Sequence, residues 1–266
     1  MQYVNFSDRY AEVATLWTAL SEASKVLIIY GFVMALALVL TFVISYADER
    51  TIRDVGIWVK PMKFMAATAL FAWTTVWLVC ISSLNVDSSP SFNRIAALLI
   101  STSLFEVLYI TYQGSQGLPS HYNNTDSLHI FLFGLMGIAA VGLTFSQAWL
   151  AWAIWQEQRF EEINVVTLGV LIGLFLTFFL GTFSGFLLGG NQPPAGQGLP
   201  IVGWHLQSDI RPAHFLGIHA QQFIPLLALF ADRYLGNFAF VTVIFGSCVY
   251  LLAWISLVWI ALCAQQ

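Results

Sequence analysis

The chain has 266 residues, of which 58% are hydrophobic and only 9% are charged, and its mean hydropathy is +0.76. An ordinary soluble domain carries about 25% charged residues, so this composition excludes that class. The net charge of -4 is small and the chain has no run of Lys and Arg, which argues against a nucleic-acid partner. We therefore expect a membrane protein in direct contact with the lipid bilayer.

Residues 1–24 predict an amphipathic helix that lies on the membrane surface. Asp8, Arg9 and Glu12 interrupt the stretch in which a signal peptide needs an apolar core. From Tyr10 to Leu20, apolar residues recur at spacings of three and four, as on one face of a helix. The same pattern also fits a helix packed against the loops of a bundle.

Seven apolar blocks follow, each long enough to cross a hydrocarbon layer of about 30 Å as a helix. They cover residues 25–46, 62–84, 93–113, 128–155, 163–188, 212–231 and 238–263. We expect residues 25–266 to form a single all-α transmembrane bundle without a soluble domain. An odd number of spans places the chain ends on opposite sides, called face A for the N-terminus and face B for the C-terminus.

The connections differ between the two faces. Those on face A are short and charged, whereas the face-B segments 113–127 and 189–214 are long and rich in Gly, Pro, Asn, Gln and His. Such loops are expected to fold back into the mouth of the bundle. Lys and Arg are equally frequent on the two faces, but if Lys60, Lys63 and Arg211 belong to a site, the remaining charges favour face A inside. We therefore expect face B to be non-cytoplasmic.

All five histidines fall on face B or within about two turns of it: His121, His129, His205, His214 and His219. Taken singly, His129 and His205 fit interfacial or hydrogen-bonded residues, and His121 fits a helix cap. As a set, His121, His129, His214 and His219 are candidate ligands of a haem or of a transition metal such as Fe, Cu or Zn.

Glu106 lies in the third span, about 10 Å below its face-B end. A carboxyl group at that depth is costly unless it is protonated, paired or bound to an ion, so Glu106 is a candidate metal ligand or proton acceptor. Its predicted depth matches that of His219 in the sixth span. His214 and His219 point about 140° apart on an ideal helix, so they do not form the zinc-binding pair of an HExxH motif.

Further polar residues accompany these groups at face B. Lys60 and Lys63 fit either an interfacial anchor with snorkelling side chains or a clamp for a phosphate, a carboxylate or a haem propionate. Arg211, Gln113 and Asn123 complete the predicted cofactor-binding set.

Three stretches resemble an uncharacterised group of bacterial polytopic membrane proteins: Gln113 to Asn123, Arg211 to Gln222, and Lys60-Pro61-x-Lys63-Phe64. The resemblance covers the second to sixth spans and implies a bacterial inner membrane, with no activity attached. A second comparison is with the seven-helix zinc hydrolases of the alkaline ceramidase and adiponectin receptor type, which use an HxxxH pair. Here the pair is HxxxxH and lies in the sixth span, not the seventh.

Three functions therefore compete. The leading hypothesis is a redox protein with a His-ligated haem or transition metal near face B, acting on a lipophilic substrate or a quinone. The alternative is a zinc-dependent membrane hydrolase in which Glu106 or Asp209 is the general base. The third is a proton-coupled transporter or channel-like subunit. Against this last hypothesis, the ionisable residues do not continue to face A.

Overall fold

The structure is a computed structural model that describes residues 15, 17–82, 89–157, 163–196, 198–200, 202–205 and 207–264. In this part of the chain, seven helices are long and apolar enough to cross a membrane. They are α2 (Glu22–Ser45), α3 (Val59–Ile81), α4 (Pro90–Ser115), α5 (Ser127–Glu157), α6 (Val165–Gly190), α7 (Arg211–Tyr234) and α8 (Ala239–Cys263). The prediction of an all-α membrane bundle is confirmed, and each predicted span ends within three residues of a helix end. The chain is an integral membrane protein.

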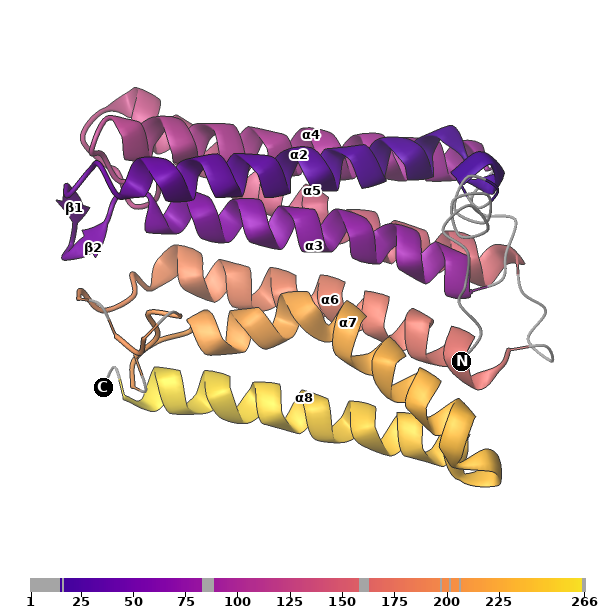
Figure 1. The fold of residues 1–266 in the computed structure, drawn as a ribbon. Coiled ribbons are helices and arrows are strands. Elements are labelled where there is room, and N and C mark those ends of the chain that lie inside the picture. Colours follow the sequence, from indigo (N-terminus) through magenta and orange to yellow (C-terminus); the bar gives the residue numbers. More distant parts are fainter. Residues whose placement is uncertain are drawn as a thin grey trace, which may run out of the picture.

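The helices form two groups (Figure 1). Helices α2 to α5 pack together as a four-helix group, and α6 to α8 form a three-helix group below it in this view. The short strands β1 (Thr51–Ile52) and β2 (Val55–Gly56) make a hairpin at the end where α8 finishes, which is face B. The 3-10 helix η3 (Gly236–Phe238) connects α7 to α8 at face A.

Three of the helices that begin at face A have side-chain caps. The hydroxyls of Ser21 and Ser89 accept the backbone N–H groups of Ser24 and Phe92, and the side chain of Asn164 accepts the N–H of Thr167. Each cap satisfies a donor that has no partner inside its helix. The predicted surface helix over 1–24 overlaps the first residues of α2, which begins at Glu22. Most of the predicted helix lies outside the described residues.

Glycines bring α6 and α7 very close together. A Cβ atom at Gly217 would lie 2.8 Å from the backbone carbon of Leu180, and one at Gly169 would lie 2.3 Å from Cβ of Ala228. Small residues at such crossings let two membrane helices pack backbone against backbone. Pro225 interrupts α7, which changes direction along its course (Figure 1). The pair α6–α7 is therefore a tightly packed unit within the three-helix group.

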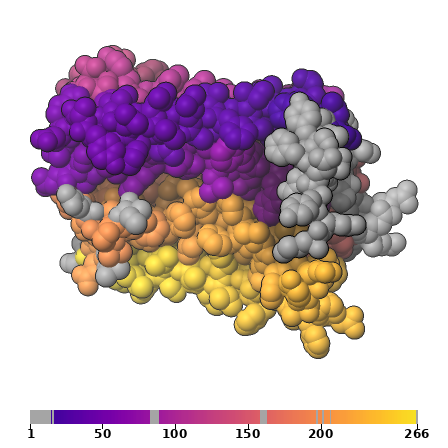
Figure 2. Space-filling model, in the orientation of Figure 1, coloured from indigo at the N-terminus to yellow at the C-terminus, as the bar shows by residue number. Residues whose placement is uncertain are grey.

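The two groups meet through α3, α5, α6 and α7, and Figure 2 shows them in contact over the part of this face that the coloured atoms cover. At face B, side chains of the four-helix group bond backbone carbonyls of the segment that joins α6 to α7. Lys63 Nζ donates to the carbonyl of Val202 at 2.6 Å, and Arg53 Nη2 donates to that of Pro193 at 2.8 Å. The long face-B loop thus folds back over the bundle.

Candidate functional site at face B

Five ionisable side chains near face B are linked pairwise by electrostatic interactions, and we call them the face-B cluster: Lys60, Glu106, His121, His214 and His219. Glu106 is within electrostatic range of Lys60, Lys60 of His121, His121 of His214, and His214 of His219. Lys60 comes from α3, Glu106 from α4, His121 from the following loop and the last two from α7. The cluster therefore spans the boundary between the two helix groups.

Glu106 and Lys60 are the oppositely charged members of the cluster. Glu106 is only 7% exposed, and no described carboxylate lies within 4.0 Å of Lys60 Nζ. The hydroxyl of Tyr30, on α2, also lies within electrostatic range of Glu106 and is bonded to Ser103 Oγ at 2.9 Å. Glu106 thus lies within electrostatic range of a cation without a salt bridge to it, in an interior where isolated charges are costly.

Two further polar atoms on α4 lie near the same end of the helix. Tyr109 Oη and Gln113 Oε1 are buried and have no hydrogen bond of good geometry to a described residue, although the Gln113 side chain lies near the Tyr109 hydroxyl one turn away. Buried polar atoms without partners are rare in native proteins and commonly indicate a bound water, an ion or a functional role. Gln113, predicted from the sequence to bind a cofactor, is one of them.

His214 is held by its neighbours on α6. Ser184 Oγ lies 2.6 Å from the carbonyl of Leu180 and 3.1 Å from His214 Nδ1, and the imidazole also bonds the backbone of Gly181. When the serine donates its single proton to Leu180, it accepts from His214, and the imidazole proton is then on Nδ1. A histidine whose Nδ1–H is held by a hydrogen bond is oriented as metal-binding histidines usually are.

His219 is oriented in the same way and connects the cluster to the membrane interior. Its Nδ1 donates to Gln222 Oε1 at 3.2 Å, because an amide oxygen can only accept. The amide nitrogen of Gln222 then donates to Thr74 Oγ1 on α3 at 3.0 Å. This contact joins the three-helix group to the four-helix group below the cluster.

His121 sits in the loop after α4, between the rings of Phe64 and Phe133. Burial lowers the pKa of His121 to about 3, and the nearby Lys60 charge acts in the same direction. His121 is therefore a neutral imidazole near pH 7. Its Nδ1 lies 3.2 Å from Ser120 Oγ.

Three residues predicted for the site have other partners in the structure. His129 bonds Asp126 at 2.7 Å at the start of α5. Asn123 holds its own loop, donating to the carbonyl of Pro119 and accepting from Thr125. Lys63 bonds the Val202 carbonyl, so its ammonium does not belong to the cluster. None of the three faces Glu106 in the contacts that the structure gives.

Asp209 and Arg211 form an ion pair at the start of α7. Arg211 Nη2 donates to Asp209 Oδ2 at 2.8 Å, and the backbone N–H of His205 donates to the same oxygen. Burial alone would raise the pKa of Asp209, but the hydrogen bonds from Arg211 and His205 outweigh it and hold this pKa below its usual value. This carboxylate is engaged in holding the loop, so the structure gives no support to Asp209 as a general base.

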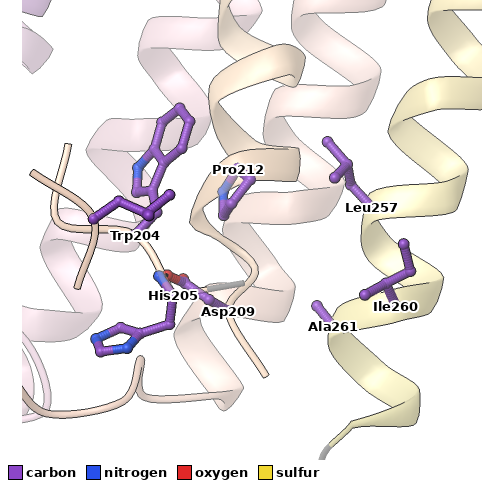
Figure 3. A pocket seen from close by; sticks show the side chains of 8 residues that line it. Trp204, His205, Asp209, Pro212, Leu257, Ile260 and Ala261 are labelled. Atoms are coloured by element: carbon purple, nitrogen blue, oxygen red, sulfur yellow. Dashed lines mark hydrogen bonds between the residues drawn. The ribbon is translucent and has the colours of Figure 1, made fainter. Parts of the chain in front are cut away.

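A cavity of about 130 Å³ lies beside this ion pair (Figure 3). Leu257, Ile260 and Ala261 of α8 line one side, and the other side is lined by Pro212, Asp209 and the loop residues Trp204 and His205. A second, shallow hollow of about 260 Å³ is lined by Phe145, Ala148, Trp149 and Trp152 of α5. Neither space is lined by a member of the face-B cluster.

The three-ligand metal site expected of a zinc hydrolase is not assembled in the described part of the chain. No three of its His, Cys, Asp and Glu side chains lie close enough together to hold one ion. His121 and His214, from different helix groups, lie within electrostatic range of each other.

Sequence reasoning missed a set of uncharged polar residues deep in the spans. Thr75 on α3 and Gln147 on α5 are fully buried, and Thr75 Oγ1 lies 3.5 Å from Gln147 Oε1. Gln147 in turn donates to Ser146 Oγ at 2.9 Å. The sequence did contain a signal for this set, namely the amide of Gln147 inside an apolar block. A buried amide in a membrane helix needs a hydrogen-bonding partner.

No protein-family model, curated protein or solved structure matches this chain. The functional assignment consequently depends on the geometry of the cluster and its surroundings.

Proposed function

We propose that this chain is a proton-coupled membrane protein, with Glu106 as the group that takes up and releases the proton. The observation that carries the proposal is that Glu106 is buried in α4 within electrostatic range of Lys60, yet no salt bridge joins the two side chains. A contact ion pair would hold both charges permanently. The observed arrangement leaves the carboxyl group available to exchange its proton.

The physical reason is the cost of charge in a membrane interior. A carboxylate and an ammonium that do not touch each lose hydration without regaining it from the partner. Protonation of Glu106 removes the carboxylate's share of that cost, whereas the Lys60 charge favours the ionised form. The two effects oppose each other, and small changes in the surroundings then decide where the proton resides.

The chemistry needs a donor and an acceptor on either side of Glu106. A proton binds to the carboxylate, converts it to the neutral acid, and leaves again as the carboxylate re-forms next to Lys60. The Tyr30 hydroxyl, bonded to Ser103, faces the same carboxyl from α2.

Infrared difference spectroscopy of the purified protein, recorded as the pH is stepped, tests this assignment. We expect a carboxylic acid C=O band that appears on acidification, disappears in Glu106→Gln and shifts in Glu106→Asp. Lys60→Met should change the pH at which the band appears. An unchanged band in Glu106→Gln would assign the proton to another carboxyl group and overturn the proposal.

A redox protein with a haem or a transition metal is the second candidate, favoured by the contact of His214 Nδ1 with Ser184 Oγ, which orients the imidazole. His121, across the group boundary, would supply a second imidazole, and Lys60 would neutralise an acidic substituent of the cofactor. The bound haem or metal would contribute electron transfer, with a quinone or another lipophilic molecule as the redox partner. Purification with bound Fe or Cu and a Soret band would favour this candidate over the first.

We further propose that the protein resides in a bacterial inner membrane, based on the three resembling stretches around Lys60, Gln113 and Arg211. Localisation of a tagged chain by membrane fractionation tests this assignment, and recovery in the outer-membrane fraction would overturn it.

A further inference from the structure

We propose that the loop between α6 and α7 is a gate over the face-B cluster, and that Tyr122 is its latch. The structure describes this face-B loop over residues 191–196, 198–200, 202–205 and 207–210. The inference rests on the proposed function, because the gate is assigned to control the exchange of the Glu106 proton with face B. It adds a conformational step to that exchange and names the residue that holds the gate closed.

The loop is tied to residues that stand next to members of the cluster. Tyr122 directly follows His121, and Lys63 lies one turn after Lys60 on α3. Glu106 is only 7% exposed, and neither cavity described above is lined by a cluster residue. Exchange of a proton between Glu106 and face B is therefore expected to need an opening motion, and this loop crosses the boundary between the two helix groups there.

The bonds between the loop and the four-helix group are of a kind that breaks readily. Arg53 Nη2 donates to the Pro193 carbonyl, and the backbone N–H of Gly196 donates to the Arg53 carbonyl at 3.2 Å. Lys63 Nζ donates to the Val202 carbonyl. Both cationic side chains are exposed, so water can replace the bond that each one makes, and the loop can leave the four-helix group at a small cost.

The loop is held more firmly to the three-helix group. The side chain of Asp209 is fully buried and accepts from Arg211 and from the backbone N–H of His205, each at 2.8 Å. Hydrogen bonds to an ionised carboxylate are stronger than those between neutral groups. Ser208 Oγ also donates to the Ala264 carbonyl at 2.8 Å, where α8 ends. On opening, the loop should therefore stay with α7 and α8 and separate from the four-helix group.

Tyr122 has the features expected of a latch. Its φ angle of +56° lies in the left-handed region, which is unfavourable for a large side chain and needs other contacts to hold it. Its hydroxyl donates to the carbonyl of Leu188, near the end of α6, and lies 3.3 Å from that of Asn191. The ring centroid lies 5.3 Å from that of Phe133. When the hydroxyl bonds break, the backbone at Tyr122 can relax, and His121 beside it changes position.

Ordinary loop packing is the simpler explanation for these bonds, and two features favour a gate over it. Backbone strain of the kind seen at Tyr122 is commonly found in switching segments, and here it lies next to a member of the cluster. The bonds also differ in strength on the two sides of the loop, which gives the opening a preferred direction.

Deuterium exchange at Glu106 tests the gate in the full chain, reconstituted in lipid nanodiscs. After transfer from H2O to D2O, at a pH at which the acid band is present, the C=O band of Glu106 shifts to lower frequency as its proton is replaced. The rate of this shift reports opening towards water, and hydrogen exchange of a peptide covering residues 188–205 reports movement of the loop. We expect Tyr122→Phe to raise both rates about fivefold, as the loss of one hydrogen bond implies.

Tyr112→Phe is the matched control, because Tyr112 is 61% exposed and lies at the face-B end of α4. Both rates should equal those of the parent. Arg53→Met is a second test variant, which should also raise both rates and decides the outcome if Tyr122→Phe does not fold.

Two results would overturn the gate. Faster exchange of the loop with unchanged exchange at Glu106 would show that the loop does not control access, and unchanged rates in both variants would show that these bonds do not hold it. In either case a Glu106 band in the parent leaves the proposed function standing. Absence of that band in the parent overturns the proposed function and the gate together.

Discussion

Ser184 Oγ lies 3.1 Å from His214 Nδ1 across the interface between α6 and α7, and 2.6 Å from the carbonyl of Leu180 in its own helix. When the hydroxyl donates to Leu180, it can only accept from the imidazole. We therefore expect this intrahelical hydrogen bond to keep the proton of His214 on Nδ1.

Replacement of Ser184 by Ala should release this constraint. The Nδ1–H of His214 would lose its acceptor, at a cost of about 1–3 kcal/mol for a buried unpaired donor. Nitrogen NMR of labelled histidine should show a single tautomer of His214 in the parent and a mixture in the variant. Ser247→Ala removes an equivalent intrahelical bond on α8 and should leave the histidine signals unchanged. An Nε2–H tautomer in the parent would contradict the assignment.

Gly217→Ala should destabilise the α6–α7 pair. The new methyl group would lie 2.8 Å from backbone atoms of Leu180 and Gly181, and those atoms can move only if the helices separate. We expect a loss of about 1–3 kcal/mol in the free energy of unfolding, measured in mixed micelles. Gly134→Ala, where nothing lies within 4 Å of the added Cβ, is the control and should be neutral or slightly stabilising. Equal effects of the two changes would refute close packing at Gly217.

The Asp209–Arg211 pair should make stability depend on acid pH. The pKa of Asp209 is lower in the folded protein than its ordinary value of 3.8, so its contribution is present above about pH 4 and is lost as the pH falls through the folded-state value. Lys63 of α3 and Arg211 are the charged groups that face it. Thermal unfolding between about pH 6 and pH 3 should show this loss in the parent. The acid-dependent slope should be reduced in Asp209→Asn, and an identical profile would contradict the role of this carboxylate.

Lys63→Met should loosen the face-B loop. Its ammonium bonds the Val202 carbonyl at 2.6 Å, so its removal frees that segment from α3. Hydrogen exchange of a peptide covering residues 198–205 should become several-fold faster, whereas peptides from the α6–α7 core should not change. Lys25→Met removes an exposed pair with Glu22 at face A and should not alter exchange in the loop.

The arrangement of spans could be predicted because it depends on hydropathy alone. Apolar blocks of the required length have no stable alternative to a membrane helix, and polar caps such as Ser89 and Asn164 mark where they begin. Glu106 and the histidines could be located for the same reason, since ionisable side chains stand out against apolar spans.

The partners of those residues could not be predicted. Lys60 and Lys63 are three residues apart, yet their partners differ. Lys60 lies within electrostatic range of Glu106, whereas Lys63 bonds a loop carbonyl 139 positions away. Asp209 could be proposed as a base because the sequence does not show that Arg211 is folded against it. Gln222 and Thr74 belong to spans that are distant in sequence, so their contact depends on the packing of the two helix groups.

The length of α5 has a consequence for the choice of membrane. Its 31 residues extend roughly 46 Å, well beyond a hydrocarbon layer of about 30 Å, and tilting alone does not absorb the excess. Trp149 and Trp152 near its face-A end are suited to the headgroup region, which leaves the last turn outside the lipid tails. A thicker bilayer would bring this turn and its polar residues closer to the lipid tails, whereas the shorter helices are too short to follow the increase in thickness. Bilayer thickness is therefore expected to strain α5 against its neighbours, so lipid chain length becomes a variable that acts on this protein through one helix.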